Sequence, residues 1–419
     1  MKPSSANLDR TSQGANRNAG WWALGNGLVS TTLVSYFAQN LGAQSAAVSW
    51  IIAAPKLVGV LRWFAPRLLK LGGSYRTTST TAFLLSTFFL LLLPLCAVES
   101  LWPSNTAAIW GIVICWCLYH LAEYCGFVIF IAWLMQLVPP EVRGRFFGLR
   151  ERWLTAGNLV GFLFAGLLAA TLRNGLEVDL RWITYPFMAV YGAIAIGISV
   201  GPLRFIPEPK TIQPPDHSLR DDWRHWSSPR ARWFLLYGTW FSAANGLFST
   251  LLYVYPYRGL DLSLLIPLTM AASMRLGQSI ISRRVGVTID RYGWRPVMIC
   301  GQLLIALGPI LFAFGTAGYI AGNLVWIAYA LINVALPIAI VDGKTDQNAA
   351  PPLALYFAWT GLVYGLTALA GQGIADLFVS LEYRSDASAY FPYFLVATLA
   401  RLSAVLPLLW LPAESNADK

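Results

Sequence analysis

Charged residues are scarce in this chain, and histidine and cysteine are scarcer still. Only 12% of its 419 residues are Asp, Glu, Lys or Arg, about half of the share in a soluble globular protein. The three histidines and five cysteines form no Cys-x-x-Cys pair, and each cysteine lies in an apolar run, so we expect neither disulfides nor a metal site. A phosphate-binding loop of the form Gly-x-x-x-x-Gly-Lys-Ser/Thr is absent as well. We therefore expect no cofactor and no ATP-driven step.

Long apolar runs dominate the chain instead. Apolar residues make up 56% of it, and its mean hydropathy is +0.55, which excludes an ordinary cytosolic enzyme and a disordered protein. The runs are about 20 residues long, the length at which a helix crosses a bilayer. We predict an all-α membrane protein with twelve transmembrane helices, near residues 20–42, 46–66, 77–98, 106–137, 146–171, 181–206, 232–257, 263–284, 295–316, 319–342, 353–378 and 390–411.

One long polar connection divides these helices into two sets of six. It runs from Pro207 to about Arg232 and is rich in Pro, Asp, Arg and Trp. The first 18 residues are polar and lack the apolar core of a signal peptide, so the first helix should stay in place. We predict a tail at 1–18, a six-helix bundle at 19–206, a central loop at 207–231, a second bundle at 232–412 and a tail at 413–419.

Basic residues gather in loops on one side of the predicted membrane. Most of the 30 lysines and arginines fall on the side of the N-terminus, and the other side has only Arg173, Arg181, Arg258 and Arg384. Because cytoplasmic loops are enriched in Lys and Arg, both termini are predicted to be cytoplasmic, in the cell (inner) membrane. The net charge of +10 follows from this asymmetry, and we expect no nucleic-acid partner.

The chain matches itself when it is shifted by 219 residues. The run Asn26–Thr31 (NGLVST) returns as Asn245–Thr250 (NGLFST). The same shift relates Lys56 to Arg275, Arg76 to Arg295 and, more loosely, Glu123 to Asp342. Later the shift falls to 212, which relates Pro139-Pro140 to Pro351-Pro352. We infer a duplicated six-helix unit in parallel orientation, with a pseudo-two-fold axis along the membrane normal.

A motif follows the eighth predicted helix. Gly286–Pro296 reads GVTIDRYGWRP and resembles the G-x-x-x-D-R-x-G-x-R signature of the major facilitator superfamily. The resemblance implies secondary transport by alternating access, with a cytoplasmic gate at Gly286, Asp290, Arg291, Gly293 and Arg295. Asp290 would pair with loop arginines and cap a neighbouring helix. A basic loop that only fixes the topology is the alternative.

Two further loops belong to the predicted gate. The first-half copy, residues 67–76, keeps its basic residues and glycines, among them Arg76, but lacks the acid. The charged stretch at 139–152, which ends with Glu151 and Arg152, resembles the family's P-x-x-x-R-G-R stretch and contributes Arg143 and Arg145. These charges would form an ion-pair network with the central loop, so the second-half motif is expected to carry most of the gate.

Polar residues on four helices are the predicted solute contacts. In the family that the chain resembles, helices 1, 4, 7 and 10 line the central cavity. Trp22, Asn26 and Ser30 follow one another every four residues and so share one helix face. The set of predicted contacts on these helices is Trp22, Asn26, Ser30, Asn245, Ser249 and Asn333. The alternative is that the Asn-Gly pairs only allow close helix packing.

Ionisable residues within the predicted helices are costly and therefore point to function. Lys56 and Arg275 either bind an anionic group of the solute or neutralise Glu123 and Asp342 in their own halves; we favour the second. Glu123 is the leading proton-coupling candidate, with His120 as a relay. Asp342 and Asp376 are further candidates, although Asp376 could instead pair with Arg401. His120 and Glu123 lack a third ligand, so we predict no metal site.

The sequence thus predicts a transporter rather than an enzyme. We expect a monomer in the lipid bilayer that moves a small solute by alternating access, coupled to protons. A sugar, an organic anion and a peptide-like solute all suit the mixed polar residues. The alternative is a lipid flippase or a membrane assembly or pigment-handling factor of similar fold, without solute–proton coupling.

Overall fold

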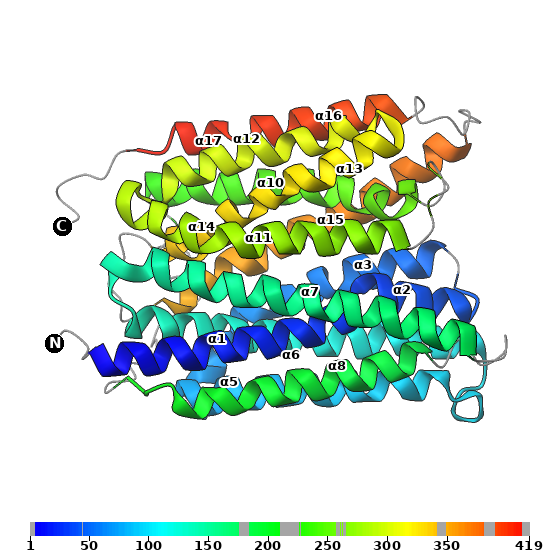
Figure 1. Ribbon diagram of the computed structural model, residues 1–419, viewed down its shortest axis with the longest axis horizontal. Helices are drawn as coiled ribbons and strands as arrows, with labels where there is room; N and C mark the ends of the chain where they lie inside the picture. Colours follow the sequence, from blue (N-terminus) through cyan, green and yellow to red (C-terminus); the bar gives the residue numbers. More distant parts are fainter. Residues whose placement is uncertain are drawn as a thin grey trace.

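The computed structural model describes residues 5–43, 45–175, 184–209, 226, 228–256, 260, 262, 265–341, 349–380 and 390–412. Within these ranges the secondary structure is helical, without strands. Eight helical stretches among them are long and apolar enough to cross a membrane. The helices run roughly along one axis (Figure 1), as expected for a chain whose backbone polar groups must be satisfied inside lipid.

The first half contains six helical rods, several of them interrupted. They are α1 (Ser5–Leu28) with α2 (Thr31–Asn40), α3 (Ser45–Val58) with η1 (Gly59–Phe64) and α4 (Ala65–Gly72), α5 (Tyr75–Leu92) with η2 (Leu93–Ala97), α6 (Asn105–Leu137), α7 (Arg143–Gly175), and α8 (Thr184–Val200) with η6 (Gly201–Phe205). Pro55 lies inside α3 and Pro66 begins α4, which explains the 3-10 segment between them, since proline removes a helical hydrogen bond.

The second half repeats this arrangement. Its rods are α10 (Pro229–Val254), α11 (Leu265–Tyr292), α12 (Trp294–Phe312), α13 (Gly315–Val325) with η8 (Trp326–Ala328) and α14 (Tyr329–Val341), α15 (Ala350–Ser380), and α16 (Phe391–Ser403) with α17 (Leu406–Leu409). The described residues therefore form the twelve predicted rods, and the predicted all-α membrane fold is confirmed. The first helix begins earlier than predicted, because the polar residues from Ser5 onward extend α1.

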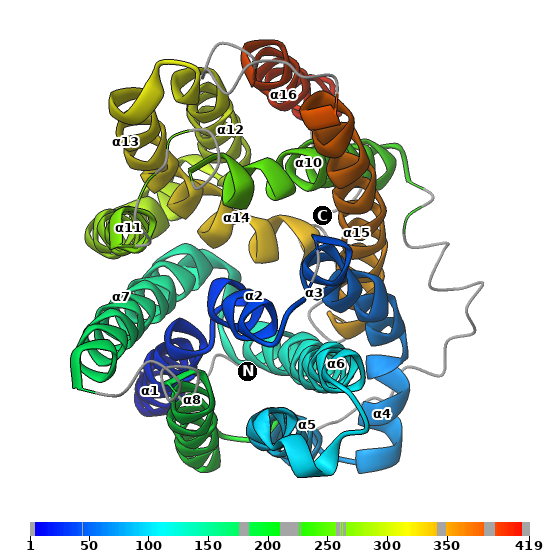
Figure 2. The ribbon, with the colours of Figure 1, turned by 90° about the vertical axis from the view of Figure 1, so that its right-hand side faces the viewer.

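The two bundles meet along two seams. Viewed from one end, α7 packs against α11 and α3 packs against α15 (Figure 2). By the internal repeat these are helix pairs 5–8 and 2–11, related by the pseudo-two-fold axis. The helices that face the other bundle are therefore the ones that would have to slide for the bundles to tilt.

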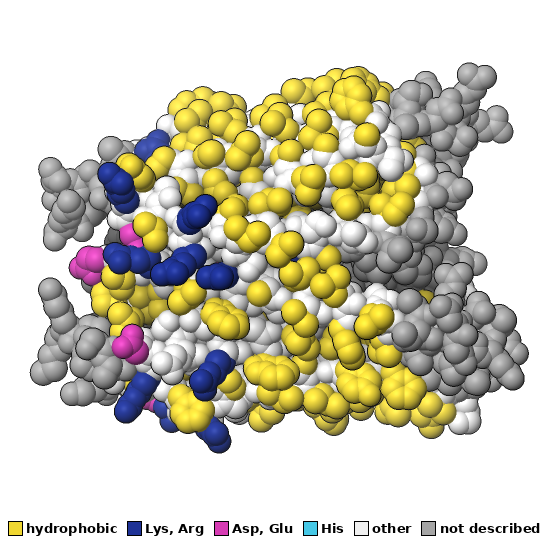
Figure 3. All heavy atoms as spheres, viewed as in Figure 1, with side chains coloured by type: hydrophobic (Ala, Val, Ile, Leu, Met, Phe, Trp, Pro, Cys, Tyr) yellow, Lys and Arg dark blue, Asp and Glu magenta, His cyan; other side chains and the backbone are white. Residues whose placement is uncertain are grey.

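The apolar cores show where the bundles are joined. One core combines residues from both halves, such as Trp133, Phe234 and Tyr356, and its members lie at the end of the molecule where α1 begins. Two other cores lie toward the opposite end, and each belongs to one half. Lys and Arg side chains gather at the end with the shared core, beyond an apolar middle (Figure 3). The bundles are thus closed against each other at the basic end.

Candidate functional site

A buried carboxylate lies at the centre of a polar cluster in the first half. Glu123 on α6 is 3% exposed. Its Oε1 accepts from Asn26 Nδ2 on α1 at 3.4 Å, and its Oε2 lies 2.8 Å from His120 Nδ1. The Tyr119 hydroxyl is 3.0 Å from Glu123 Oε1 and 2.9 Å from Asn26 Oδ1, so its single proton serves one acceptor at a time. Three of the predicted site residues, Asn26, His120 and Glu123, therefore meet here.

Lys56 does not pair with Glu123, so that part of the prediction is wrong. Its Nζ donates to the Tyr124 hydroxyl at 3.2 Å and lies 5.5 Å from the centre of that ring. Tyr124 follows Glu123 directly on α6, about 100° further round the helix, and so presents a different face to α3. Lys56 Nζ also lies 5.6 Å from the ring of Tyr364, on α15 of the other half.

A second buried cation, which the sequence analysis did not single out as a site residue, shares Tyr124. The Arg62 guanidinium lies 4.0 Å from the centre of the Tyr124 ring, and its Nε donates to the Gly59 carbonyl at 2.7 Å. Arg62 is 6% exposed. A Cβ added at Gly361 of α15 would lie 3.2 Å from Arg62 NH2. The α3–α15 seam thus holds two cations among aromatic rings. An unbroken helix would place Lys56 and Arg62, six residues apart, on different faces, so their spacing did not indicate that both would contact Tyr124.

The second half repeats the Asn–Tyr hydrogen bond that forms the frame of this cluster. Asn245 Oδ1 accepts from the Tyr329 hydroxyl at 3.0 Å, the counterpart of Asn26 with Tyr119. In this region the repeat has a shift of 210 residues, which relates Trp116, Tyr119 and Glu123 to Trp326, Tyr329 and Asn333. Glu123 therefore corresponds to Asn333, rather than to Asp342 as the shift of 219 suggested.

Asn333 bonds across the two bundles. Its Nδ2 donates to Glu151 Oε1 on α7 at 3.1 Å. Glu151 is 8% exposed and interacts electrostatically with Arg275 and Arg150. Arg275 also donates to Gln278 Oε1 at 2.9 Å. The sequence analysis left Glu151 in a loop network, whereas α7 begins at Arg143 and carries Glu151 two turns into the helix.

Two predicted solute contacts form hydrogen bonds within their own rods, and their role toward a solute stays a prediction. Ser30 Oγ accepts from the Leu33 backbone N–H at 3.3 Å, and so caps α2 after the break in the first rod. Ser249 Oγ donates to the Gly246 carbonyl at 2.7 Å. Trp22 packs half-buried against the apolar core of the first half, and its carbonyl accepts from Asn26 Nδ2 at 3.1 Å.

Two predicted coupling residues cannot be placed. Asp342 and the side chain of Asp376 lie outside the described residues, so their roles stay predictions, as do the pairs Arg275–Asp342 and Arg401–Asp376. Arg401 itself is 3% exposed and lies over the rings of Phe248 and Trp326, at 4.7 and 5.4 Å.

The predicted gate contains one contact across the bundles. Asp290 Oδ1 accepts from the Gly144 N–H at 2.7 Å, and Oδ2 accepts from the Arg145 N–H at 2.9 Å and from Arg145 Nε at 3.2 Å. The carboxylate therefore caps the N-terminus of α7, where its charge also opposes the helix dipole favourably. A Cβ at Gly286 would overlap the Gly144 carbonyl oxygen, so the two helices touch by their backbones.

Other gate candidates hold elements of their own bundle. Arg76 NH2 donates to the Ile206 carbonyl at 2.7 Å, and Arg295 donates to the Leu408 and Leu409 carbonyls at 2.9 and 2.8 Å. These repeat-related arginines tie the third rod to the sixth and the ninth to the twelfth, and their part in the gate stays a prediction.

The last gate candidates lie at helix ends. Arg143 donates to the Met135 and Val138 carbonyls at the end of α6, at 2.8 and 3.2 Å. Arg291 lies over its neighbour Tyr292, at 5.1 Å. Gly293 connects α11 to α12 with a φ of 81°, a value that glycine adopts without strain.

Solved structures with a similar fold include several solute transporters. The chain superposes with a TM-score of 0.70 on the proton:xylose symporter XylE (14% identity, 97% of this chain and 96% of that chain), a protein of E. coli. It superposes at 0.68 on the E. coli fucose:proton symporter FucP (13% identity, 96% and 98%) and at 0.60 on the human organic anion transporter MFSD10 (14% identity, 95% and 99%). At such identities the similarity shows the fold alone.

Sequence comparison gives the family. A segment is 26% identical over 152 residues to the class B tetracycline resistance protein of Escherichia coli, and this match spans 35% of either chain. The family model described as Major Facilitator Superfamily matches residues 22–285, well over half of the sequence. The chain belongs to the Major Facilitator Superfamily.

Proposed function

We propose that this protein is a secondary active transporter that moves a small solute by alternating access and couples the movement to protons at Glu123. The supporting observation is the environment of that carboxylate. Among the described residues its hydrogen-bond partners are Asn26, Tyr119 and His120, and Lys56, the nearest predicted counter-ion, turns to Tyr124 instead. A carboxylate that is hydrogen-bonded to neutral or titratable groups, and to no lysine or arginine directly, can take up a proton without breaking a salt bridge.

The closed basic end suits one state of such a cycle. Asp290 on the α7 terminus and the backbone contact between Gly144 and Gly286 hold the two bundles together there. Opening to that side would break both contacts and separate the shared apolar core. We further propose, as the basic residues of this end favour, that it faces the cytoplasm of the cell membrane and that the protein works as a monomer.

We propose that the solute carries an acidic group. Lys56 lies near the rings of Tyr124 of one bundle and Tyr364 of the other, and Arg62 lies over the same Tyr124 ring. Neither cation forms a salt bridge with a carboxylate among the described residues, although Arg62 lies close enough to Glu123 to interact with it electrostatically. Buried cations are costly when unpaired, so an anion arriving at the α3–α15 seam gains from both. Because the predicted Lys56–Glu123 pair is wrong, the alternative that Lys56 contacts an anion becomes the better one.

Transport of a panel of acids tests both the proton coupling at Glu123 and the acidic nature of the solute. Purified protein in proteoliposomes with an internal pH dye would be offered gluconate, glucuronate and succinate, with xylose and glucose as neutral controls. We expect at least one acid to drive proton movement, and Glu123→Gln to reduce that signal to the background of empty liposomes. Glu141→Gln, an exposed carboxylate at the basic end, should leave it unchanged. Equal signals from the two variants would overturn the coupling role.

Binding separates the solute class from the coupling. Lys56→Gln should weaken binding of the active acid about tenfold or more, because a hydrogen bond to a charged group contributes about 1.5–3 kcal/mol, whereas Lys56→Arg should retain most of it. Proton-coupled movement of xylose alone, unaffected by Lys56→Gln, would leave a transporter and remove the acidic solute. Lipid scrambling in the absence of any solute flux would instead support a flippase.

A further inference from the structure

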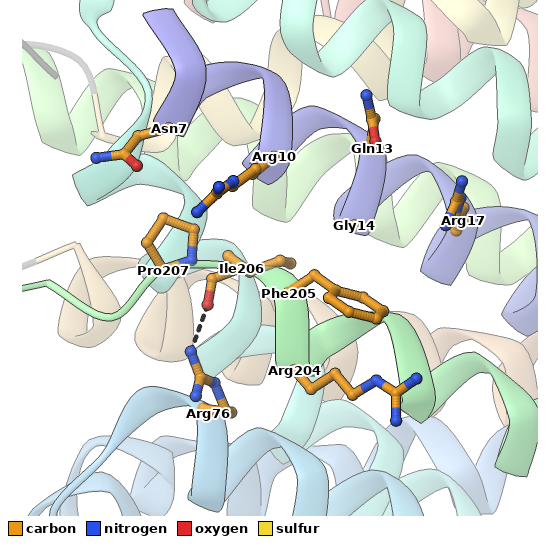
Figure 4. A pocket seen from close by; sticks show the side chains of 10 residues that line it. All are labelled: Asn7, Arg10, Gln13, Gly14, Arg17, Arg76, Arg204, Phe205, Ile206 and Pro207. Carbon is orange, nitrogen blue, oxygen red and sulfur yellow. Dashed lines mark hydrogen bonds between the residues drawn. The ribbon is translucent and has the colours of Figure 1, made fainter. Parts of the chain in front are cut away.

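A basic pocket lies at the end of the first bundle, away from the seams and from Glu123. It has a volume of about 610 Å³ and opens between the start of α1 and the η6 segment (Figure 4). Four arginines line it: Arg10 and Arg17 of α1, Arg76 of α5 and Arg204 of η6. None of the described residues that line the pocket is acidic. Four positive charges therefore share one concave site without a lining carboxylate.

These arginines have little else to bind within the described parts of the chain. Arg10 and Arg17 are exposed, and neither has a hydrogen bond or an ion pair there. Arg204 lies over the ring of Phe205 at 4.6 Å. Arg76 uses its NH2 for the Ile206 carbonyl, while its buried Nε has no hydrogen-bond partner.

The half-buried Glu208 follows the lining residue Pro207 and uses one carboxylate oxygen for a helix cap, while its Oε2 has no hydrogen-bond partner among the described residues. Glu208 Oε1 accepts from Ser74 Oγ at 2.8 Å and from the Arg76 backbone N–H at 2.7 Å, and so caps the start of α5 rather than an arginine side chain. Guanidinium groups are well suited to phosphate because they offer paired N–H donors in one plane. A phosphate group would satisfy donors that the described residues leave free.

The surroundings of the pocket favour a lipid over a soluble phosphate. An exposed apolar stripe on α8 and η6 leads to it, consisting of Phe187, Tyr191, Ile194, Ile198 and Phe205. Trp21, one turn beyond Arg17 on α1, is 43% exposed, as an aromatic residue at a membrane interface would be. A headgroup in the pocket would thus have an apolar surface along which its acyl chains could lie.

We propose that this pocket binds the headgroup of an anionic phospholipid. The phosphate would lie between α1 and η6, and the acyl chains along the exposed stripe of α8. Basic pockets between helices on the cytoplasmic side are suited to such headgroups. The site is independent of the solute pathway, so it stands whether or not the protein transports an acid.

Lipid retention by the full-length protein tests the proposal. Detergent-solubilised protein would be titrated with phosphatidylglycerol and with phosphatidylcholine, and bound lipid measured by native mass spectrometry. In the triple variant Arg10→Gln, Arg17→Gln, Arg204→Gln we expect phosphatidylglycerol to bind about tenfold more weakly. Arg76 is left intact because it holds the Ile206 carbonyl. The matched control replaces Arg67, Arg283 and Arg284 by Gln, which are exposed arginines outside the pocket, and should change the affinity less than about twofold.

Three outcomes would overturn the proposal. Equal weakening in the triple variant and the control would show attraction by net charge alone. Equal binding of phosphatidylcholine and phosphatidylglycerol would show that the net negative charge of the headgroup is not recognised. Competition of inorganic phosphate or glycerol phosphate at the concentration of the lipid would identify a soluble anion as the occupant. Circular dichroism of each variant verifies that the helices are retained.

Discussion

The two seams between the bundles are related by the internal repeat, yet their chemistry differs. At the α7–α11 seam the backbones of Gly144 and Gly286 touch and Asp290 caps the facing helix. At the α3–α15 seam Lys56 and Arg62 lie among aromatic rings instead. Duplication thus preserved which helices meet, while side chains diverged into a backbone contact on one side and a pair of cations on the other.

The polar clusters differ in the same way. Both halves keep the Asn–Tyr pair, Asn26 with Tyr119 and Asn245 with Tyr329. Four residues after the tyrosine, the first half has Glu123 and the second half has Asn333. An ionisable group therefore occupies only one of the two positions, which is why the proposed proton coupling is assigned to the first bundle.

The largest effect is expected when alanine replaces a glycine at each seam, because the added methyl group would contact backbone at one seam and a side chain at the other. Gly286→Ala places a Cβ against the Gly144 carbonyl, which is backbone and cannot move aside, and should destabilise the fold by about 1–3 kcal/mol. Gly365→Ala at the other seam meets the Leu57 Cδ2 at 2.7 Å, and a flexible side chain can shift, so its cost should be smaller.

Thermal unfolding of the purified variants measures this difference. Gly166→Ala is the control, because nothing lies within 4 Å of its added Cβ, and it should leave the unfolding temperature unchanged or raise it slightly. A Gly365 variant less stable than the Gly286 variant would contradict the description of α7–α11 as the more rigid seam.

A smaller effect is expected from the carboxylate that crosses the α7–α11 seam. Asp290→Asn removes a charged cap from α7 and should cost about 1 kcal/mol, with the bundles separating more often at the basic end. Spin labels at Leu71 and Leu409, both exposed and on opposite bundles, report that separation once the five native cysteines are replaced.

Glu208→Gln is the matched control for this change. Glu208 caps α5 in a similar way but within one bundle. It should lower stability by a comparable amount without lengthening the distance between the labels. If both variants lengthen it equally, the Asp290 contact has no special part in holding the bundles together.

The sequence predicted the helical rods and the helix cap formed by Asp290 better than it predicted ion pairs between side chains. Apolar run length fixes the number of spans, because the bilayer imposes it. The motif spacing correctly brought Asp290 to a helix terminus. The Lys56–Glu123 pair failed because a one-residue step on α6 decides whether Glu123 or Tyr124 faces α3, and periodicity cannot resolve a rotation of about 100°.

Contacts that depend on helix starts and breaks were also missed. Glu151 was assigned to a loop network because the charges of residues 141–152 obscured the start of α7, and the cap that Ser30 forms on α2 was not predicted because the break in the first rod was not visible. In both cases the deciding factor is tertiary packing, which carries no local signal in the sequence.

The smallest predicted effect compares the two tyrosines of the repeated frame. Tyr329→Phe removes one neutral bond to Asn245, a contact that averages about 0.6 kcal/mol between membrane helices. Tyr119→Phe removes a hydroxyl that also serves the Glu123 carboxylate, so it should cost more, and it alone should change the pH dependence of solute-driven proton movement. Unfolding in detergent and the proteoliposome assay at several pH values measure the two effects. An unchanged pH profile in the Tyr119 variant, or an equal change in the Tyr329 variant, would mean that the frame and not its carboxylate sets the response.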